Sequence, residues 1–186
     1  MIELLAAIAA KADQRKSESQ RIKADLIATM PSLRRYAFSL CGHREKADDL
    51  VQETMVKALS NLSSFQRDTD LRAWLFTILR NSFVSDIRKR KREVEDAGGK
   101  IAESVSIAPP QQARVELADM LEALDRLPPV QREAVLLVGA GGLSYDEAAE
   151  VANCAVGTIK SRVNRARAAL NAQFGLGEAD PLPNAG

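Results

Sequence analysis

The chain has 186 residues, a formal net charge of +1, 46% hydrophobic residues and 27% charged residues, which is ordinary for one globular domain or two small ones. Aromatic residues make up only 4%, so the core must be aliphatic, and abundant alanine and leucine favour helices. The only histidine, His43, and two unclustered cysteines, Cys41 and Cys154, argue against a metal site. Unpaired thiols suit a cytoplasmic protein, and no run approaches the ~18 apolar residues of a membrane span.

The first predicted element is a short amphipathic helix in an N-terminal extension, residues 1–23. It begins MIELLAAIAAKADQRK, where the acidic Glu3 precedes a short apolar run. A signal peptide carries a basic residue at that place, so none is expected here. The helix is expected either to pack on the body or to be loosely attached.

Residues 24–93 are predicted to form the first helical domain. Within it, Arg44–Leu62 is expected to place Asp49 and Glu53 one turn apart on its outer face. Like charges at this spacing cost about a few tenths of a kcal/mol, so the fold gains nothing from them. An exposed Val56 inside this acidic patch indicates a protein partner. The predicted core stripe is Leu50, Val51, Thr54, Met55, Ala58, Leu59 and Leu62, with Asp48 at its edge, and the predicted outer face is Asp49, Gln52, Glu53, Val56, Lys57 and Ser60.

A polar loop, Ser63–Asp70, is followed by a helix that carries the only tryptophan, Trp74. Cations accompany it at Arg72, Arg80 and from Arg88 to Arg92. A basic surface beside aromatic side chains is typical of single-stranded nucleic-acid binding. The alternative, favoured for Trp74 and for Phe76 taken singly, is that each ring belongs to the core.

Residues 94–112 read VEDAGGKIAESVSIAPPQQ, and the Gly-Gly and Pro-Pro pairs predict a flexible linker. A second helical domain is expected over residues 113–174, and a disordered Gly- and Pro-rich tail over residues 175–186. No alternating strand pattern occurs. The predicted fold is therefore all-α, with two small helical domains on a flexible linker.

In the second domain, one helix must end at Pro128-Pro129, and Pro129 can open the next. Ser144 and Glu147 have the spacing of a capping box, which predicts a helix start at Ser144. The glycines just before it could suggest a phosphate loop. No Lys-Ser/Thr pair follows them and no strand precedes them, so a helix-to-helix turn is the better interpretation.

The last helix contains AVGTIKSRVNRARAAL, with four cations and no acid. At ~100° per residue, one narrow apolar stripe is predicted, consisting of Val156, Ile159, Val163, Ala166 and Leu170. The rest of the surface is basic or polar, with Thr158, Lys160, Ser161, Arg162, Asn164 and Arg165, and Arg167 beside the stripe. A broad cationic helix after a short capped helix predicts a DNA-binding helix-turn-helix. The alternative is a solvated basic helix without a ligand, although solvated faces normally mix charges.

Four stretches occur in order: DDLVQET, LRAWLFTILRNSFVSDIRKRKR, LPPVQREAVLLV and LSYDEAAEVANCAVGTIKSRVNRARAAL. Together, over residues 26–174, they resemble the extracytoplasmic-function (ECF) sigma factors of bacterial RNA polymerase. The details are most like the general-stress-response subgroup of alphaproteobacteria. The N-terminal extension exceeds the minimal core of this family.

The resemblance implies a role in transcription initiation with core RNA polymerase (β′ clamp helices and β subunit), promoter DNA and a small NepR-like anti-sigma factor as partners. The linker would run through the polymerase channel. The implied core-binding residues are Asp48, Asp49, Gln52, Glu53 and Val56. Those implied for the −10 element, where a flipped base is held, are Ser63, Ser64, Phe65, Arg67, Arg72, Trp74, Arg80 and Arg88. Those implied for the −35 element are Thr158, Lys160, Ser161, Arg162, Asn164, Arg165 and Arg167.

Three other classes of protein are less favoured. An enzyme or cofactor-binding protein is not expected, because the sequence has no nucleophile–base constellation, phosphate loop or metal cluster. A sigma-mimic that binds an anti-sigma factor should carry a receiver domain, for which this chain has no room. A stand-alone helix-turn-helix regulator would leave the acidic face of the first domain unexplained.

Overall fold

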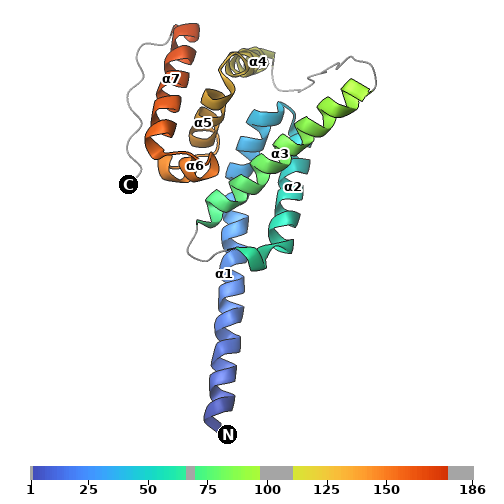
Figure 1. Cartoon of the computed structure of the whole chain (residues 1–186), viewed down its shortest axis with the longest axis vertical. Helices are drawn as coiled ribbons and strands as arrows, with labels where there is room; N and C mark the ends of the chain where they lie inside the picture. The colour runs from blue at the N-terminus through green and yellow to red at the C-terminus, as the bar shows by residue number, and fades with distance from the viewer. Residues whose placement is uncertain (1, 66–69, 97–110, 176–186) are drawn as a thin grey trace.

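The computed structural model describes residues 2–65, 70–96 and 111–175, and every regular element in these ranges is a helix (Figure 1). The all-α prediction is therefore confirmed. Most of the predicted linker and nearly all of the predicted tail lie outside the described residues. The elements are α1 (Ile2–Cys41), α2 (Arg44–Ser60), the 3₁₀ turn η1 (Leu62–Ser64), α3 (Leu71–Asp96), α4 (Gln111–Asp125), α5 (Pro129–Gly139), α6 (Tyr145–Val151) and α7 (Val156–Phe174).

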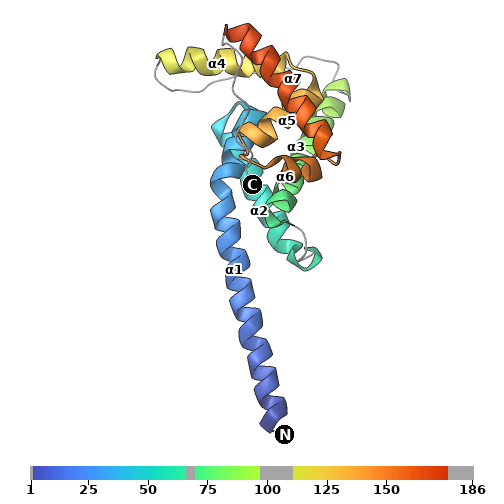
Figure 2. The same cartoon turned by 90° about the vertical axis from the view of Figure 1, so that its left-hand side faces the viewer.

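The N-terminal extension differs from the predicted short helix. It is the first part of α1, which runs unbroken for 40 residues into the body of the protein. Figures 1 and 2 show this part extending away from all other helices. The prediction of a short helix rested on one apolar run. No stop signal lies near Lys23, so the sequence was compatible with this continuity.

The N-terminal half is built from the second part of α1 together with α2 and α3. Gly42 allows the sharp reversal between α1 and α2, since its φ of +68° is open to glycine at no steric cost. The reversal lays α2 back along α1, and α3 packs on both. Most of the predicted stripe on α2 is buried, but Leu59 is 52% exposed, so its assignment to the core is wrong. Leu59 lies in the last turn of α2, where the packing surface ends.

The C-terminal half starts and stops its helices as predicted. Pro129 is the first residue of α5. The Ser144 hydroxyl accepts from the Glu147 N–H at 3.2 Å, and the Glu147 carboxylate accepts from the Ser144 N–H at 2.6 Å, which confirms the capping box. Asn153, at φ +49°, turns the chain from α6 into α7. Ile159, Val163 and Ala166 of the predicted stripe are buried, with Val156 and Leu170 packed beside them.

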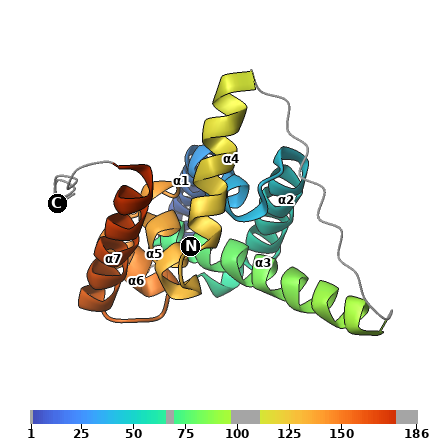
Figure 3. The same ribbon diagram turned by 90° about the horizontal axis from the view of Figure 1, so that it is seen from above.

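The two halves pack against each other. Helix α6 lies on α3, and α5 contacts α1. Buried side chains from both halves form one contiguous hydrophobic cluster, which includes Phe76 from α3 and Leu137 from α5. Seen from above, α5, α6 and α7 gather on one side of the molecule and α2 on the other (Figure 3). This contact was not expected from the sequence, which predicted two domains related only by a linker.

Candidate functional site

The acidic face of α2, which we define as Asp49, Gln52, Glu53 and Val56, is exposed as predicted. Val56 is 63% exposed, so most of its apolar surface is open to solvent. Lys57 lies next to this face, where its ammonium group contacts Glu53 at 2.5 Å and donates to the Ser82 hydroxyl of α3 at 2.8 Å. The charge of Glu53 is thus partly balanced, whereas the Asp49 carboxylate forms no ion pair with any of the described residues.

Asp48 does not share this surface fully. Its carboxylate pairs with the Arg34 guanidinium of α1 at 3.3 Å, and its side chain is 42% exposed. The ion pair ties α2 to α1 at the surface. Asp48 is thereby brought to the edge of the acidic face rather than into it.

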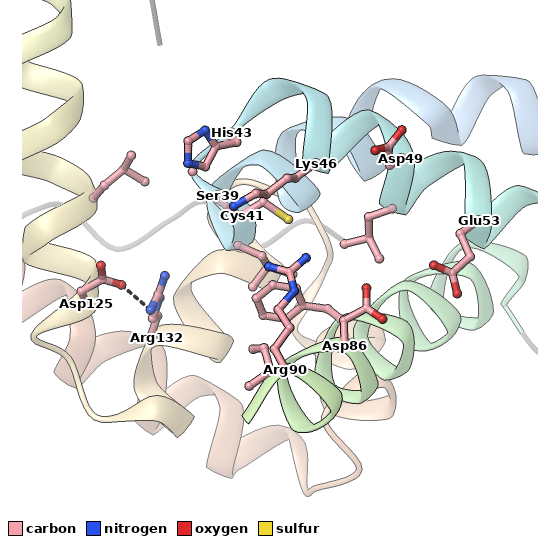
Figure 4. Close-up of a pocket in the computed structure, with 16 residues that line it drawn as sticks. Ser39, Cys41, His43, Lys46, Asp49, Glu53, Asp86, Arg90, Asp125 and Arg132 are labelled. Carbon is pink, nitrogen blue, oxygen red and sulfur yellow. Dashed lines mark ion pairs between the residues drawn. The ribbon is translucent and has the colours of Figure 1, made fainter. Parts of the chain in front are cut away.

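A groove of about 550 Å³ opens beside the acidic face and is lined by both halves of the chain (Figure 4). Asp49 and Glu53 lie along its α2 wall, and Asp125 and Arg132, which form an ion pair, belong to the C-terminal wall. Burial raises the pKa of the Cys41 thiol at this groove, so the thiol stays protonated and weakly reactive at neutral pH. The groove offers a partner contact with both halves at once.

Two aromatic rings meet where η1 leads toward α3. The Phe65 and Trp74 rings lie 5.2 Å apart between centroids, and Trp74 is half-buried. The Asp70 carboxylate accepts from the N–H groups of Arg72 and Ala73, at 2.7 and 3.2 Å, which fixes the start of α3. The aromatic pair therefore borders the polar loop predicted to hold a base.

The other residues predicted for the −10 element do not all gather at this corner. Ser64 and Arg88 are exposed. Arg67 and the side chain of Ser63 lie outside the described residues. Phe76 is fully buried, which confirms its assignment to the core.

Arg72 and Arg80 face the C-terminal half. We call the polar contact that they and Arg35 make with the α5–α6 turn, Glu133 and Glu147 the docking contact. Arg72 donates through one nitrogen to the carbonyl oxygens of Gly141 and Gly142, each at 2.8 Å, and lies 3.7 Å from the Glu147 carboxylate. Arg80 forms a hydrogen-bonded ion pair with Glu133 of α5, which raises the pKa of its guanidinium. A third arginine, Arg35, donates to the Ala140 carbonyl at 3.2 Å.

The partners in the docking contact were missed by the sequence analysis. Glu147 was assigned only to the capping box, and Gly141 only to a turn. Glu133 carried no local pattern that would have marked it. Their shared role comes from residues more than fifty positions away along the chain, and no helical periodicity reports such a distance.

The outer face of α7 carries the predicted basic and polar residues. Lys160, Ser161, Asn164 and Arg165 are exposed, whereas Thr158, Arg162 and Arg167 are half-buried. The Lys160 ammonium lies 5.6 Å from the centroid of the Tyr145 ring. The Arg162 guanidinium contacts the Cys154 sulfur at 3.7 Å, a weak interaction that leaves the group available to a stronger acceptor.

Neither a metal nor a membrane is indicated in the described parts of the chain. No group of three or more His, Cys, Asp or Glu side chains there could hold a metal ion. No described helix has both the length and the apolar character to cross a bilayer.

Each half of the chain matches a known protein family. Residues 26–93 match the model of Sigma-70 region 2, and residues 117–170 match that of Sigma-70 region 4. The ECF RNA polymerase sigma factor EcfG of Rhodopseudomonas palustris (strain TIE-1) is 57% identical over 151 residues, covering 81% of this chain and 83% of that protein.

Solved structures agree with this assignment. The sigma factor RpoE of Bartonella quintana, in complex with the anti-sigma factor NepR, has a TM-score of 0.75 and 47% identity, over 86% of this chain and 99% of that one. CnrH in complex with the cytosolic domain of CnrY has a TM-score of 0.64 and 30% identity, over 90% and 96% of the two chains. With both family regions matched and this identity to a curated relative, the chain belongs to the ECF family of RNA polymerase sigma factors.

Proposed function

We propose that this chain binds core RNA polymerase through the acidic face of α2 and directs the polymerase to promoters through two DNA contacts. One observation carries the proposal. The basic outer face of α7 is exposed while the opposite side of the same helix, at Ile159, Val163 and Ala166, is fully buried. Such a helix is held rigidly by its apolar edge and presents its cations to a groove of DNA.

The two DNA contacts would differ in what they recognise. Arg162 and Arg165 would each offer a planar guanidinium, the group that can bind guanine O6 and N7 together in the major groove, to the −35 element. At the −10 element, the Phe65–Trp74 corner would stack with an unpaired base, since aromatic faces accept any base. Neither task requires a catalytic group or cofactor on this chain, and both take place in the cytoplasm, where RNA polymerase acts.

A small anti-sigma factor of the NepR kind is the proposed regulator, and a general stress response is the proposed setting. The regulator is proposed from similarity to the Bartonella quintana sigma factor crystallised with the anti-sigma factor NepR. The setting is proposed from the resemblance of the sequence motifs to the general-stress-response subgroup. The groove beside the acidic face supports this proposal because both halves line it. A protein seated there would cover Asp49 and hold the halves together.

The proposal is tested with polymerase reconstituted from this chain and core enzyme. A promoter is first identified by sequencing the transcript starts that this polymerase produces, and substituted chains are then compared on that promoter. If Arg165 contacts a base, Arg165→Ala should weaken binding to the −35 element by about 1–3 kcal/mol, seen as reduced protection in the footprint. The Phe65–Trp74 pair should be unaffected. Phe65→Ala should instead reduce permanganate reactivity of thymines at −10, because the flipped base loses its support. Footprinting and permanganate probing of the same complexes separate the two effects.

Lys23→Ala, which removes an exposed cation from α1, serves as the charge-matched control and should change neither readout. Equal effects of Arg165→Ala and Phe65→Ala on strand opening alone would contradict the proposed division between the two promoter elements.

A further inference from the structure

A second cavity, of about 400 Å³, lies between α1, α3 and α5 and adjoins the groove beside the acidic face. Its size is within the range of cavities that hold small organic ligands. Its walls are mostly apolar and recessed from the surface, since Tyr36 is 1% exposed and Leu136 is 4% exposed. The apolar wall includes Tyr36 and Leu40 of α1, Phe83 and Val84 of α3, and Val130 and Leu136 of α5.

The charged side chains at this cavity balance one another in pairs. Arg80 pairs with Glu133, and Arg132 pairs with Asp125. Burial raises the pKa of the Tyr36 phenol, so this part of the wall stays uncharged at neutral pH. A charged ligand would therefore lose its water here without gaining a counter-ion that lacks a partner, which is unfavourable in an apolar site. The cavity suits an uncharged molecule.

A buried donor at this cavity has no acceptor. The Nε–H group of Arg132 is buried without a hydrogen-bond partner among the described residues, although another nitrogen of the same guanidinium pairs with Asp125 (Figure 4). A buried donor that stays unpaired is costly, whereas a donor that gains an acceptor is stabilised. A carbonyl oxygen is an uncharged acceptor that meets this need and leaves both ion pairs in place.

We propose that this cavity binds an uncharged small molecule with an apolar body and a carbonyl group, whose oxygen accepts from the Nε–H group of Arg132. The body packs against the apolar wall, and the carbonyl lies at the charged rim. The apolar wall alone would admit many hydrophobic molecules, so the Arg132 donor is what gives the site its preference. This inference is independent of the proposed function, since it involves no contact with polymerase or DNA.

Benzophenone and diphenylmethane are matched probes for this site. Both have two phenyl rings, and only benzophenone has a carbonyl group. Each is titrated into the full chain with isotope-labelled valine and leucine methyl groups, and binding is followed by NMR. Benzophenone should shift the methyl signals of Val130 and Leu136, and it should bind about threefold to tenfold more tightly than diphenylmethane because it gains one hydrogen bond.

Two substitutions separate the apolar wall from the donor. Val130→Trp places a large ring in the cavity and should abolish binding of both probes. Val130 is 47% exposed, so the fold should tolerate the change, and Ile27→Trp, at a 67% exposed position that does not line the cavity, is the control that should bind both probes normally. Arg132→Met keeps an unbranched stem and removes the donor, so it should lower the affinity for benzophenone to that for diphenylmethane.

Equal affinities of the unsubstituted chain for the two probes, or no binding of either, would overturn the proposal. Binding that persists in Val130→Trp would place the probes elsewhere on the chain and overturn it too. An Arg132→Met chain that still prefers benzophenone would show that the donor is not the one assigned. Circular dichroism of each variant confirms that a loss of binding is not a loss of fold.

Discussion

Replacing Asp49 and Glu53 together by arginine should abolish assembly with core RNA polymerase while leaving helical content unchanged. Both side chains are exposed on α2, and reversing them turns attraction for a cationic partner into repulsion. Losing a buried, hydrogen-bonded charge at an interface costs about 2–5 kcal/mol, and like-charge juxtaposition adds to this cost. The expected result is no co-elution with core polymerase in gel filtration at concentrations where the unsubstituted chain assembles fully.

The cost to the fold should be small. Among the described residues, the double substitution breaks one ion pair, the exposed Glu53–Lys57 pair, and such a pair contributes about 0.2–0.5 kcal/mol. Asp25→Arg with Glu93→Arg provides a matched control. Both positions are exposed, and they carry the same change of charge on α1 and α3. Normal assembly of the Asp49/Glu53 variant, or equal loss of assembly in the control, would show that the acidic face does not bind the polymerase.

Phe76→Ala should be the most destabilising single substitution in the docked core, with an expected loss of about 3–5 kcal/mol. The ring is fully buried, lies 5.2 Å from the Tyr36 ring between centroids and has the Arg72 guanidinium 5.9 Å from its centroid. Its Cε1 atom also lies so close to Gly141 that a Cβ there would be only 2.7 Å away. The substitution removes packing from both halves, so urea denaturation followed by circular dichroism should change from one transition to two.

Leu59→Ala is the comparison, since Leu59 is 52% exposed and its truncation should cost less than about 1 kcal/mol, as for most exposed sites. If Phe76→Ala cost no more than Leu59→Ala, the two halves would not share a core. A single transition in Phe76→Ala would mean that other contacts hold the halves together.

Local patterns predicted the helix starts of the C-terminal half well. The Ser144–Glu147 capping box and Pro129 act within one turn of the chain, so their effect can be read from neighbouring residues. The apolar stripe on α7 was equally predictable, because Ile159, Val163 and Ala166 must share a face at helical spacing. Leu59 had the correct spacing but was misassigned, because periodicity does not say where a packing surface ends.

Contacts between distant segments were not predictable. Gly141 packs against Phe76, although the two residues are far apart in sequence. The residues next to each of them contain no pattern from which this contact could be predicted. For the same reason the sequence placed Arg72 and Arg80 on a surface for DNA without showing that Glu147 and Glu133 occupy them. The exposed faces of α2 and α7 were predicted better, since exposure follows from the opposite apolar stripe.

Binding of one promoter duplex by the chain, with and without core polymerase, tests its role as a sigma factor most directly. The free chain should bind weakly, with log K falling by about 0.9 per phosphate contact for each unit of log salt. Addition of core polymerase should give tight binding, permanganate-reactive thymines at −10 and transcripts with a defined start. Nanomolar, sequence-specific binding by the isolated chain, with no opening or transcript when core polymerase is added, would contradict this role and identify a stand-alone helix-turn-helix regulator.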